Sequence, residues 1–374
     1  MAELIQLADF RKQWEHGRAR YLEVMDRVGQ SGWLVLGKEV EAFERELAAQ
    51  WGLAHAVGVG NGLDALELSF RALGAKPGDL YLTTPLSAFA TTLAILKVGG
   101  VPVFADVDAS GLLNLESAEV VLRGLPRKPR FMVPVHLFGH SMCLGALEAF
   151  ADRHELVVVE DCAQAIGATS SGNPVGSVGV MSATSFYPTK NLGAFGDGGA
   201  VLTADPKLAQ TVRCLRDYGQ TDKYVHDFVG LNSRLDELQA ALLRSVQLPL
   251  LEEQTARRRL VAKRFLEGIS NPSVSLPVVP RETESVWHLF PALVSGERES
   301  FRAHLKGQGV ATGLHYPRLI PHQRAMAEAG LGDGGGRWPV AERFARDEVS
   351  LPMHPFLTDE EVERVIDACN TWRP

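Results

Sequence analysis

The stretch MSATSFYPTKNLGAFGDGGAVLTA, residues 181–204, decides the predicted fold. It contains two apolar runs, MSATSF (181–186) and GAVLTA (199–204), which indicate buried strands. Between them, Lys190 is followed by a loop with four glycines, GAFGDGG (193–199). A lysine in a crowded pocket can be a Schiff-base nucleophile, because desolvation and nearby cations lower its pKa, whereas a solvated lysine is only a surface charge. The role of Lys190 therefore depends on what surrounds it.

Further apolar runs alternate with amphipathic segments upstream of this stretch. The runs that indicate strands are HAVGVG (55–60), LYLTTP (80–85), VPVFADV (101–107), RFMVPVHLF (130–138) and LVVVED (156–161). Segments such as GLDALELSFRALG (62–74) and SMCLGALEAFADRHE (141–155) supply crossover helices. Strand and helix alternating in this way predict an α/β domain with a mostly parallel sheet that helices cover on both faces.

The chain has 374 residues, which favours a large domain plus a smaller one. Residues 236–269 indicate one long helical stretch, bent or interrupted at Pro249, that leads out of the parallel region. The sequence beyond it predicts a strand over 286–294 and helices over 300–309 and 358–372, the last with a capping box from Thr358 to Glu361. We place the boundary at about residue 245, between a large domain (1–245) and a small α+β domain (246–374).

Composition argues against several classes of function. The formal charge of −7 and a pI near 5.9 do not suit a nucleic-acid surface. The apolar residues within the basic cluster 256–264 have helical spacing, so the basic residues are expected on the solvent-exposed face of a helix. We expect neither a signal peptide nor a membrane span. The four cysteines lie far apart, so neither a zinc site nor a disulfide framework is expected, and the cytoplasm fits best.

Two more signals lie at predicted strand ends, where open parallel sheets bind ligands. Asp161 closes LVVVED, and a buried carboxylate needs a cationic partner unless it simply caps the following helix. GNGLDAL (60–66) places glycines at a strand-to-helix turn, a geometry that suits phosphate, although a bare turn gives the same pattern. Ala65 excludes the G-x-G-x-x-G dinucleotide motif. Together with Lys190, these signals are the parts of a pyridoxal phosphate site: a phosphate anchor, a partner for the pyridine nitrogen and an amine for the aldehyde.

At this point the sequence resembles the sugar aminotransferases of the DegT/DnrJ/EryC1/StrS family. The motifs that carry the resemblance span nearly the whole chain in the family's order: GNGLDAL (60–66), PVFADVD (102–108), PVHLFGH (134–140), VVEDCAQAIGA (158–168), SFYPTKNLGAFGDGGAV (185–201), GLNSRLDELQAALL (230–243), WHLF (287–290) and HYP (315–317). The resemblance implies the aspartate aminotransferase-like fold, fold type I, with pyridoxal phosphate as cofactor. It also implies a homodimer with active sites at the subunit interface.

The resemblance also implies roles for single residues. Lys190 would bind the cofactor as an imine and move the proton, Asp161 would pair with the pyridinium nitrogen, and Gln164 would contact the ring's phenolic oxygen. The phosphate would be held by N–H groups of Gly62 and Leu63, by the Ser185 hydroxyl, and by Asn232 of the other subunit. The alternative for Asn232 is a loop residue that caps the next helix.

The sequence departs from the family at two places. Many members have Thr or Ser at Leu63, so one side-chain contact to the phosphate is missing. Where the family stacks an aromatic on the ring, SAFAT (87–91) has Ala88 in register and Phe89 one position late. Phe89 either covers the ring after a local shift or packs in the core. His315 and Tyr316 resemble the segment that reaches the substrate, or they form a turn fixed by Pro317.

The expected function is amino transfer from an amino acid, with L-glutamate as the expected donor, to a ketone on a nucleotide-linked sugar. The stretch 218–243 is most similar to the branch that aminates carbon 3 of dTDP-linked 3-keto-6-deoxyhexoses. Amination at carbon 4 or on another keto sugar is the alternative. A sugar dehydratase is disfavoured because such relatives replace the lysine with histidine. A cofactor-binding regulator and a nicotinamide-dependent oxidoreductase are the other rivals.

Overall fold

A seven-stranded sheet forms the centre of the molecule. The computed structural model describes residues 4–332 and 335–374, and in this part of the chain the sheet has the strand order β1-β9-β8-β5-β4-β2-β3. Its strands are β1 (His55–Val59), β2 (Leu80–Thr83), β3 (Val101–Phe104), β4 (Phe131–Met132), β5 (Val157–Asp161), β8 (Met181–Ser185) and β9 (Gly199–Thr203). Strand β9 is antiparallel to both neighbours, and the remaining neighbouring pairs are parallel. The mostly parallel sheet expected from the apolar runs is confirmed.

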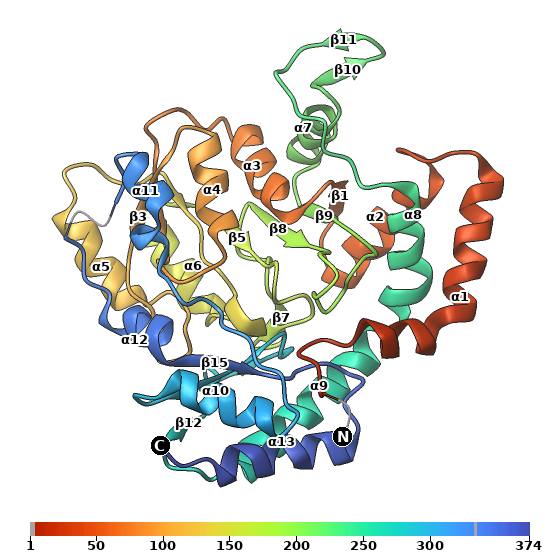
Figure 1. Cartoon of the computed structure of the whole chain (residues 1–374). Coiled ribbons are helices and arrows are strands. Elements are labelled where there is room, and N and C mark those ends of the chain that lie inside the picture. Colours follow the sequence, from red (N-terminus) through yellow and green to blue (C-terminus); the bar gives the residue numbers. More distant parts are fainter. Residues whose placement is uncertain (1–3, 333–334) are drawn as a thin grey trace.

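Helices cover both faces of this sheet (Figure 1). Side chains of successive strand residues point to opposite faces, so Val159 packs in one hydrophobic cluster and Val158 in another. The first face carries α3 (Gly62–Ala72), α4 (Phe89–Lys97) and α7 (Pro206–Arg216), and the second carries α2 (Lys38–Trp51), α5 (Leu115–Gly124) and α6 (Leu144–Arg153). The continuous apolar strands therefore have an apolar neighbour on each side.

The register of the strands brings several strand ends together. Gly199, the first residue of β9, lies opposite Val59 at the end of β1 and opposite Ser185 at the end of β8. Asp161, at the end of β5, pairs with Ala183 of β8. The segments that follow β1, β5 and β8 therefore begin at the same edge of the sheet.

A long irregular helix leads away from the sheet. It consists of α8 (Glu237–Leu242), a π-helical turn (Leu243–Gln247) and α9 (Leu248–Gly268). The irregularity expected at Pro249 thus falls on the turn before it, and the helix continues through the proline. Pro249 has no N–H to donate to the preceding turn, and a π-turn accommodates that missing bond.

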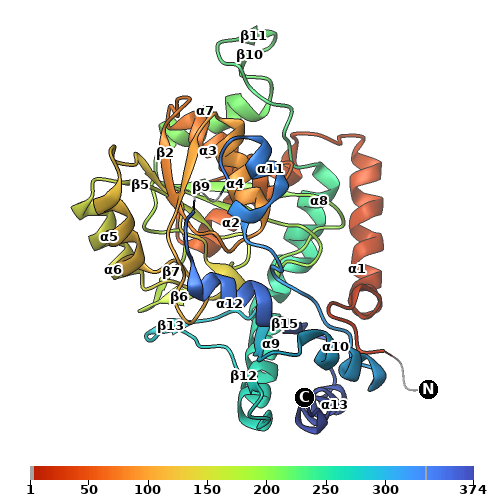
Figure 2. The same ribbon diagram turned by 60° about the vertical axis from the view of Figure 1, so that its left-hand side comes forward.

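Residues after α9 form a smaller region, most of which lies below the sheet in Figure 1, whereas α11 lies beside the sheet. Its strands are β12 (Val274–Ser275), β14 (Phe290–Val294) and β15 (Glu348–Leu351), and its helices are α10 (Arg298–Gly307), α11 (Arg324–Glu328), α12 (Pro339–Asp347) and α13 (Asp359–Thr371). The predicted capping box is present, with Thr358 and Glu361 bonded reciprocally. Figure 2 shows α11 next to α4, and the N–H of Ile320 donates to the carbonyl of Pro85. A division at residue 245 stays a prediction.

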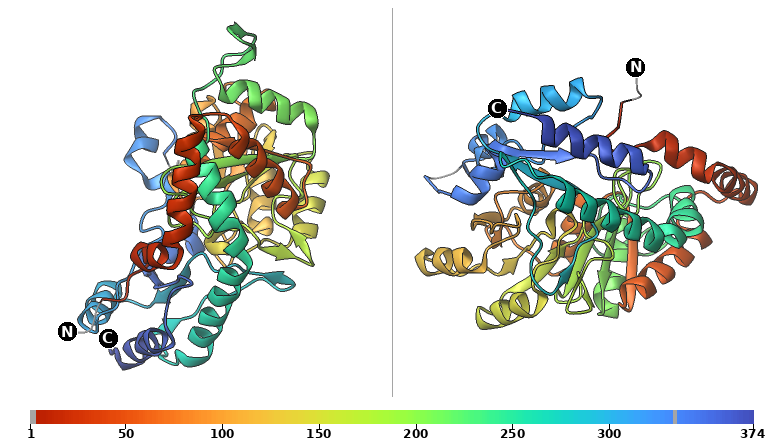
Figure 3. Two further views of the ribbon diagram at one scale, coloured as in Figure 1. Left: turned by 90° about the vertical axis from the view of Figure 1, so that its right-hand side faces the viewer. Right: turned by 90° about the horizontal axis from the view of Figure 1, so that it is seen from below.

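The remaining elements lie at the periphery. Helix α1 (Phe10–Ser31) runs beside α8 and packs on it through Tyr21, Val24 and Val28 (Figure 3). A hairpin of β10 (Gln220–Asp222) and β11 (Val225–His226) projects away from the sheet (Figure 1). The short strands β6 (Thr169–Ser170), β7 (Asn173–Pro174) and β13 (Thr283–Glu284) form a small separate sheet. Among the described helices, none is both long and apolar enough to cross a membrane.

Candidate active site

A cavity of about 210 Å³ lies where the ends of β1, β5 and β8 meet. Six of the residues predicted from the sequence line it: Gly62, Leu63, Asp161, Gln164, Ser185 and Lys190. These residues come from three separate segments of the sequence, 62–63, 161–164 and 185–190. The fold therefore brings together the proposed phosphate anchor, the carboxylate and the lysine.

The first turn of α3 forms one end of the cavity. Its N-cap residue Asn61 accepts a hydrogen bond from the N–H of Asp64 at 2.8 Å. Gly62 and Leu63 are the first two residues of α3, so their N–H groups have no acceptor within the helix. The helix dipole also favours an anion at this end. A Cβ on Gly62 would lie 2.7 Å from the Cβ of Ser185, so glycine permits the close approach of helix and strand. This end of the cavity is suited to a phosphate.

Asp161 is almost completely buried in the floor of the cavity. Its Oδ2 accepts a hydrogen bond from the Thr91 hydroxyl at 2.8 Å, and its Oδ1 accepts one from the N–H of Ala163 at 3.1 Å. Burial raises the pKa of Asp161, while these two hydrogen bonds and the nearby charge of Lys190 oppose that rise. The carboxylate is held in a fixed orientation, ready for a cationic partner.

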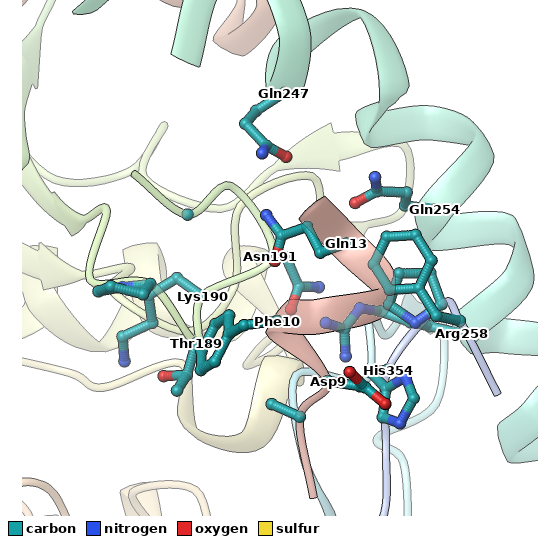
Figure 4. A pocket seen from close by; sticks show the side chains of 15 residues that line it. Asp9, Phe10, Gln13, Thr189, Lys190, Asn191, Gln247, Gln254, Arg258 and His354 are labelled. Carbon is teal, nitrogen blue, oxygen red and sulfur yellow. The ribbon is translucent and has the colours of Figure 1, made fainter. Parts of the chain in front are cut away.

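Lys190 lies in the loop after β8 and lines the same cavity as Asp161. Burial lowers the pKa of its amine to about 8, and the charge of Asp161 opposes this shift. Figure 4 shows the other side of this loop, where Asn191, Arg258 and His354 gather in a small polar pocket and the Lys190 side chain points away from them. An amine with a pKa near 8 is unprotonated in about a tenth of molecules at pH 7, far more than an ordinary lysine, and can act as a nucleophile.

Gln164 links the cavity to the smaller region of the chain. Its Oε1 accepts the N–H of Phe138 at 2.7 Å, and its Nε2 donates to the hydroxyl of Tyr316 at 3.1 Å. Burial raises the pKa of Tyr316 to about 12, so this phenol stays protonated at neutral pH. The amide of Gln164 is thereby oriented from both ends.

Four predicted residues are outside the lining of this cavity, and one of them, Tyr316, contacts it only through its hydrogen bond with Gln164. Phe89 begins α4, but its neighbours Ala88 and Ala90 line the cavity instead. Asn232 is exposed in the strand-like segment that pairs with Asp217. His315 is partly buried beside Ser350 of β15. Their proposed contacts with a cofactor or substrate stay predictions.

The sequence reasoning missed Thr91, although the residue lies in the quoted segment 87–91. Ser87 and Thr91 are four positions apart in the sequence around the start of α4, and their hydroxyl oxygens lie 3.0 Å apart. Two hydroxyl residues at this spacing in an otherwise apolar segment were the sequence pattern that could have indicated Thr91 as a site residue. Val135 and Tyr187 also line the cavity and were not predicted to do so.

Ligand atoms of His136, Glu160 and Cys162 lie within 4.8 Å of one another behind Asp161. The carboxylate of Glu160 is already occupied: it accepts from the His136 ring at 2.8 Å and from the N–H groups of Gly176, Val178 and Gly179. These bonds fix the loop that leads into β8. The cluster therefore serves to position strands β5 and β8 rather than to hold a metal ion.

Comparison with known proteins identifies the relatives of this chain. A sequence model of the DegT/DnrJ/EryC1/StrS aminotransferase family matches residues 16–370. The chain is 42% identical over 371 residues to dTDP-3-amino-3,4,6-trideoxy-alpha-D-glucose transaminase of Streptomyces venezuelae, covering 98% of this chain and 96% of the relative. It is 41% identical over 351 residues to dTDP-3-amino-3,6-dideoxy-alpha-D-galactopyranose transaminase of Aneurinibacillus thermoaerophilus, covering 94% of each.

The crystal structure of S. venezuelae DesV in complex with a ketimine intermediate superimposes with a TM-score of 0.94 at 42% identity and covers 99% of each chain. The predicted fold type I architecture, the transaminase activity and the cofactor class, pyridoxal phosphate, are confirmed by these comparisons. They leave no support for a nicotinamide-dependent oxidoreductase. This chain belongs to the DegT/DnrJ/EryC1/StrS aminotransferase family.

Proposed function

We propose that this enzyme transfers an amino group from L-glutamate to the carbon-3 ketone of a dTDP-linked 3-keto-6-deoxyhexose. The observation that carries the reaction type is that Lys190, whose amine has a lowered pKa, lines the same cavity as the buried carboxylate of Asp161. The substrate class is supported by the two relatives named above, which are both transaminases of dTDP-linked 3-amino sugars.

The residues present fit pyridoxal phosphate. The N–H groups of Gly62 and Leu63 and the hydroxyl of Ser185 line the cavity and would bind the phosphate. Asp161 would keep the ring nitrogen protonated, and Gln164 would contact the phenolic oxygen. When bound, the cofactor supplies an electron sink that stabilises negative charge on the carbon beside the reacting nitrogen.

Lys190 then serves as the base of the site. Its amine would accept a proton from the substrate carbon beside the reacting nitrogen. It would then return a proton to the carbon on the other side of that nitrogen. The lowered pKa of Lys190 suits this role, because a base with a pKa near the working pH both accepts and releases a proton readily.

We infer further that two copies of the chain form a homodimer with shared active sites. Asn232 is exposed and stands at the base of the β10–β11 hairpin, from which it would reach the phosphate of the other subunit. In and beside the same hairpin, Tyr224 is 80% exposed and Val229 is 87% exposed. In the loop before α2, Trp33 and Leu34 are each about 60% exposed. Apolar side chains exposed to this extent are typical of a protein interface. The four cysteines, all within the described residues, are free, which supports a cytoplasmic enzyme.

The acceptor is tested directly with two substrates. The enzyme loaded with pyridoxal phosphate is incubated with L-glutamate and either a 3-keto or a 4-keto 6-deoxyhexose on dTDP, and the amino sugar is detected by mass spectrometry. We expect product from the 3-keto sugar at least tenfold faster. Faster turnover of the 4-keto sugar would assign the enzyme to the alternative branch.

A further inference from the structure

The backbone segment 285–289, which leads into β14, is bonded to the loop that follows β4. The N–H of Val286 donates to the carbonyl of Gly139 at 2.9 Å, and the N–H of Leu289 donates to the carbonyl of Phe138 at 3.2 Å. Gly139 has a φ of 90°, and a Cβ on it would lie 2.6 Å from a backbone nitrogen of the facing segment. Glycine permits the two backbones to approach this closely. The two segments therefore form one fixed pair.

Helix α9 supports segment 285–289 as well. The guanidinium of Arg258 donates to the carbonyl of Trp287 at 3.2 Å, and that of Arg259 donates to the carbonyl of Ser285 at 3.0 Å. The side chain of Arg258 is almost completely buried, which limits its freedom to move. The segment is thus held by both the loop after β4 and α9.

Asn191 connects this segment to the loop 186–194 that carries Lys190. Its Nδ2 donates to the carbonyl of Val286 at 2.9 Å, and its Oδ1 lies 3.3 Å from Nδ1 of His288. Asn191 is 7% exposed, and Figure 4 shows its side chain directed away from that of Lys190. Asn191 therefore uses both ends of its amide to bind segment 285–289.

The direction of the bond to His288 follows from the bond to Val286. Because Nδ2 of Asn191 donates to Val286, Oδ1 is the atom that faces His288, and an amide oxygen only accepts. Nδ1 of His288 therefore carries a proton. Burial, together with the charges of Lys190 and Arg258, lowers the pKa of His288 well below its usual value. Both partners are thus neutral, and we expect the bond to persist throughout the neutral pH range.

The loop 186–194 is itself closed by backbone hydrogen bonds. The N–H of Ala194 donates to the carbonyl of Phe186 at 2.8 Å, and the N–H of Lys190 donates to the carbonyl of Tyr187 at 2.8 Å. Asn191 is the next residue in the chain after Lys190. The backbone of Lys190 is therefore fixed to segment 285–289 through its neighbour.

We propose that Asn191 is a positioning residue that sets the place of the Lys190 amine relative to Gln164. The side chain of Gln164 accepts the N–H of Phe138 at 2.7 Å, so it is bonded to the same pair of segments that holds Asn191. Lys190 and Gln164 both line the cavity. A displacement of about 1 Å between reacting groups can cost about a hundredfold in rate. The inference rests on the proposed roles of Lys190 and Gln164.

The kinetic test compares Asn191→Ala with Asn271→Ala as the matched control. Asn271 is also 7% exposed, and its Nδ2 donates to the carbonyls of Cys369 and Trp372 in the smaller region. Both variants lose buried hydrogen bonds to backbone carbonyls, so a loss of stability alone affects both. We expect kcat to fall at least about tenfold in Asn191→Ala with KM unchanged, and to stay within about twofold of wild type in Asn271→Ala. Equal kcat in the two variants would overturn the proposal.

A second pair of variants tests the bond from His288. Asparagine at this position places an amide N–H near the position of Nδ1 and can still donate to Asn191, whereas leucine cannot donate. We expect His288→Asn to keep at least about five times the kcat of His288→Leu. If the two variants have the same kcat, the bond from His288 has no part in positioning Lys190, contrary to the proposal.

A measurement without cofactor or turnover separates failure of this inference from failure of the proposed function. The cofactor-free protein is treated over a range of pH with acetic anhydride, which reacts with unprotonated amines, and acetylation of Lys190 is measured by mass spectrometry. Because burial lowers the pKa of Lys190 to about 8, we expect half-maximal labelling near pH 8 in the wild type and in Asn271→Ala.

In Asn191→Ala we expect the pH of half-maximal labelling to rise by at least about one, toward the ordinary lysine value, because a displaced amine is better solvated. This rise would support the positioning role of Asn191 even if the donor reaction with L-glutamate fails. The same pH of half-maximal labelling in Asn191→Ala and the wild type contradicts the proposal, even if the enzyme is an active transaminase.

Discussion

At the scale of single residues, the amine of Lys190 gives a prediction with a definite pH dependence. An amine attacks an aldehyde only in its unprotonated form. Because burial lowers the pKa of Lys190 to about 8, the unprotonated fraction rises with pH up to about 8 and then levels off. We expect the rate of pyridoxal phosphate uptake by the cofactor-free protein to follow that curve in stopped-flow absorbance. A rate that keeps rising tenfold per pH unit toward pH 10 would mean that Lys190 is an ordinary solvated lysine.

Thr91 offers a second prediction at this scale. Its hydroxyl donates to the carboxylate of Asp161, and a hydrogen bond to a charged group contributes about 1.5–3 kcal/mol. Thr91→Val should therefore weaken the ionised form of Asp161 and lower kcat/KM at least about tenfold. The matched control is Thr92→Val, because the buried Thr92 hydroxyl has no hydrogen-bond partner within the described residues. Equal activity of the two variants would show that the Thr91 bond does not tune Asp161.

At the scale of elements, the start of α3 carries the phosphate prediction. The Cβ of Gly62→Ala would lie 2.7 Å from Ser185, closer than real Cβ contacts, so helix and strand must separate. We expect cofactor affinity, measured by equilibrium dialysis, to fall at least tenfold. Gly145→Ala in α6 is the control, since its Cβ meets nothing within 4 Å and alanine stabilises a helix by about 1 kcal/mol. Unchanged affinity in Gly62→Ala would place the phosphate elsewhere.

The elements also show how far the sequence alone could be interpreted. The seven apolar runs predicted as strands between residues 55 and 204 all contribute to the central sheet, because a strand buried on both faces needs apolar residues throughout. The strand predicted over 286–294 is β14 of the smaller sheet. The run 130–138 was predicted too long: the strand is Phe131–Met132, and the chain then turns, with Phe138 at φ 61°. Apolar character indicates burial, but it does not distinguish a buried turn from a strand.

The same limit applies to the candidate site. Lys190, Asp161 and Gly62 were predictable because each follows a strand and has a distinctive local pattern. The contact between His315 and Glu348 joins residues 33 positions apart and depends on how 313–316 pairs with β15. No local spacing in the sequence encodes such a contact.

At the scale of the whole molecule, the proposed sharing of active sites between subunits predicts complementation. If Asn232 binds the phosphate in the partner's site, a mixed dimer of Lys190→Ala and Asn232→Ala subunits contains one site with both residues intact. Each variant alone should be nearly inactive, whereas the mixed sample should recover up to about a quarter of the wild-type activity per subunit, because half of randomly paired dimers are mixed and each has one intact site. Activity of the mixture equal to the sum of the separate variants would show that each site is built within one chain.

The most direct test of the central claim is the absorbance spectrum of the protein loaded with pyridoxal phosphate, recorded before and after adding L-glutamate without any sugar. The account predicts that the visible band of the lysine-bound cofactor gives way to that of the pyridoxamine form, since the donor half-reaction needs no acceptor. A cofactor that binds but shows no change with L-glutamate would contradict the proposed donor reaction.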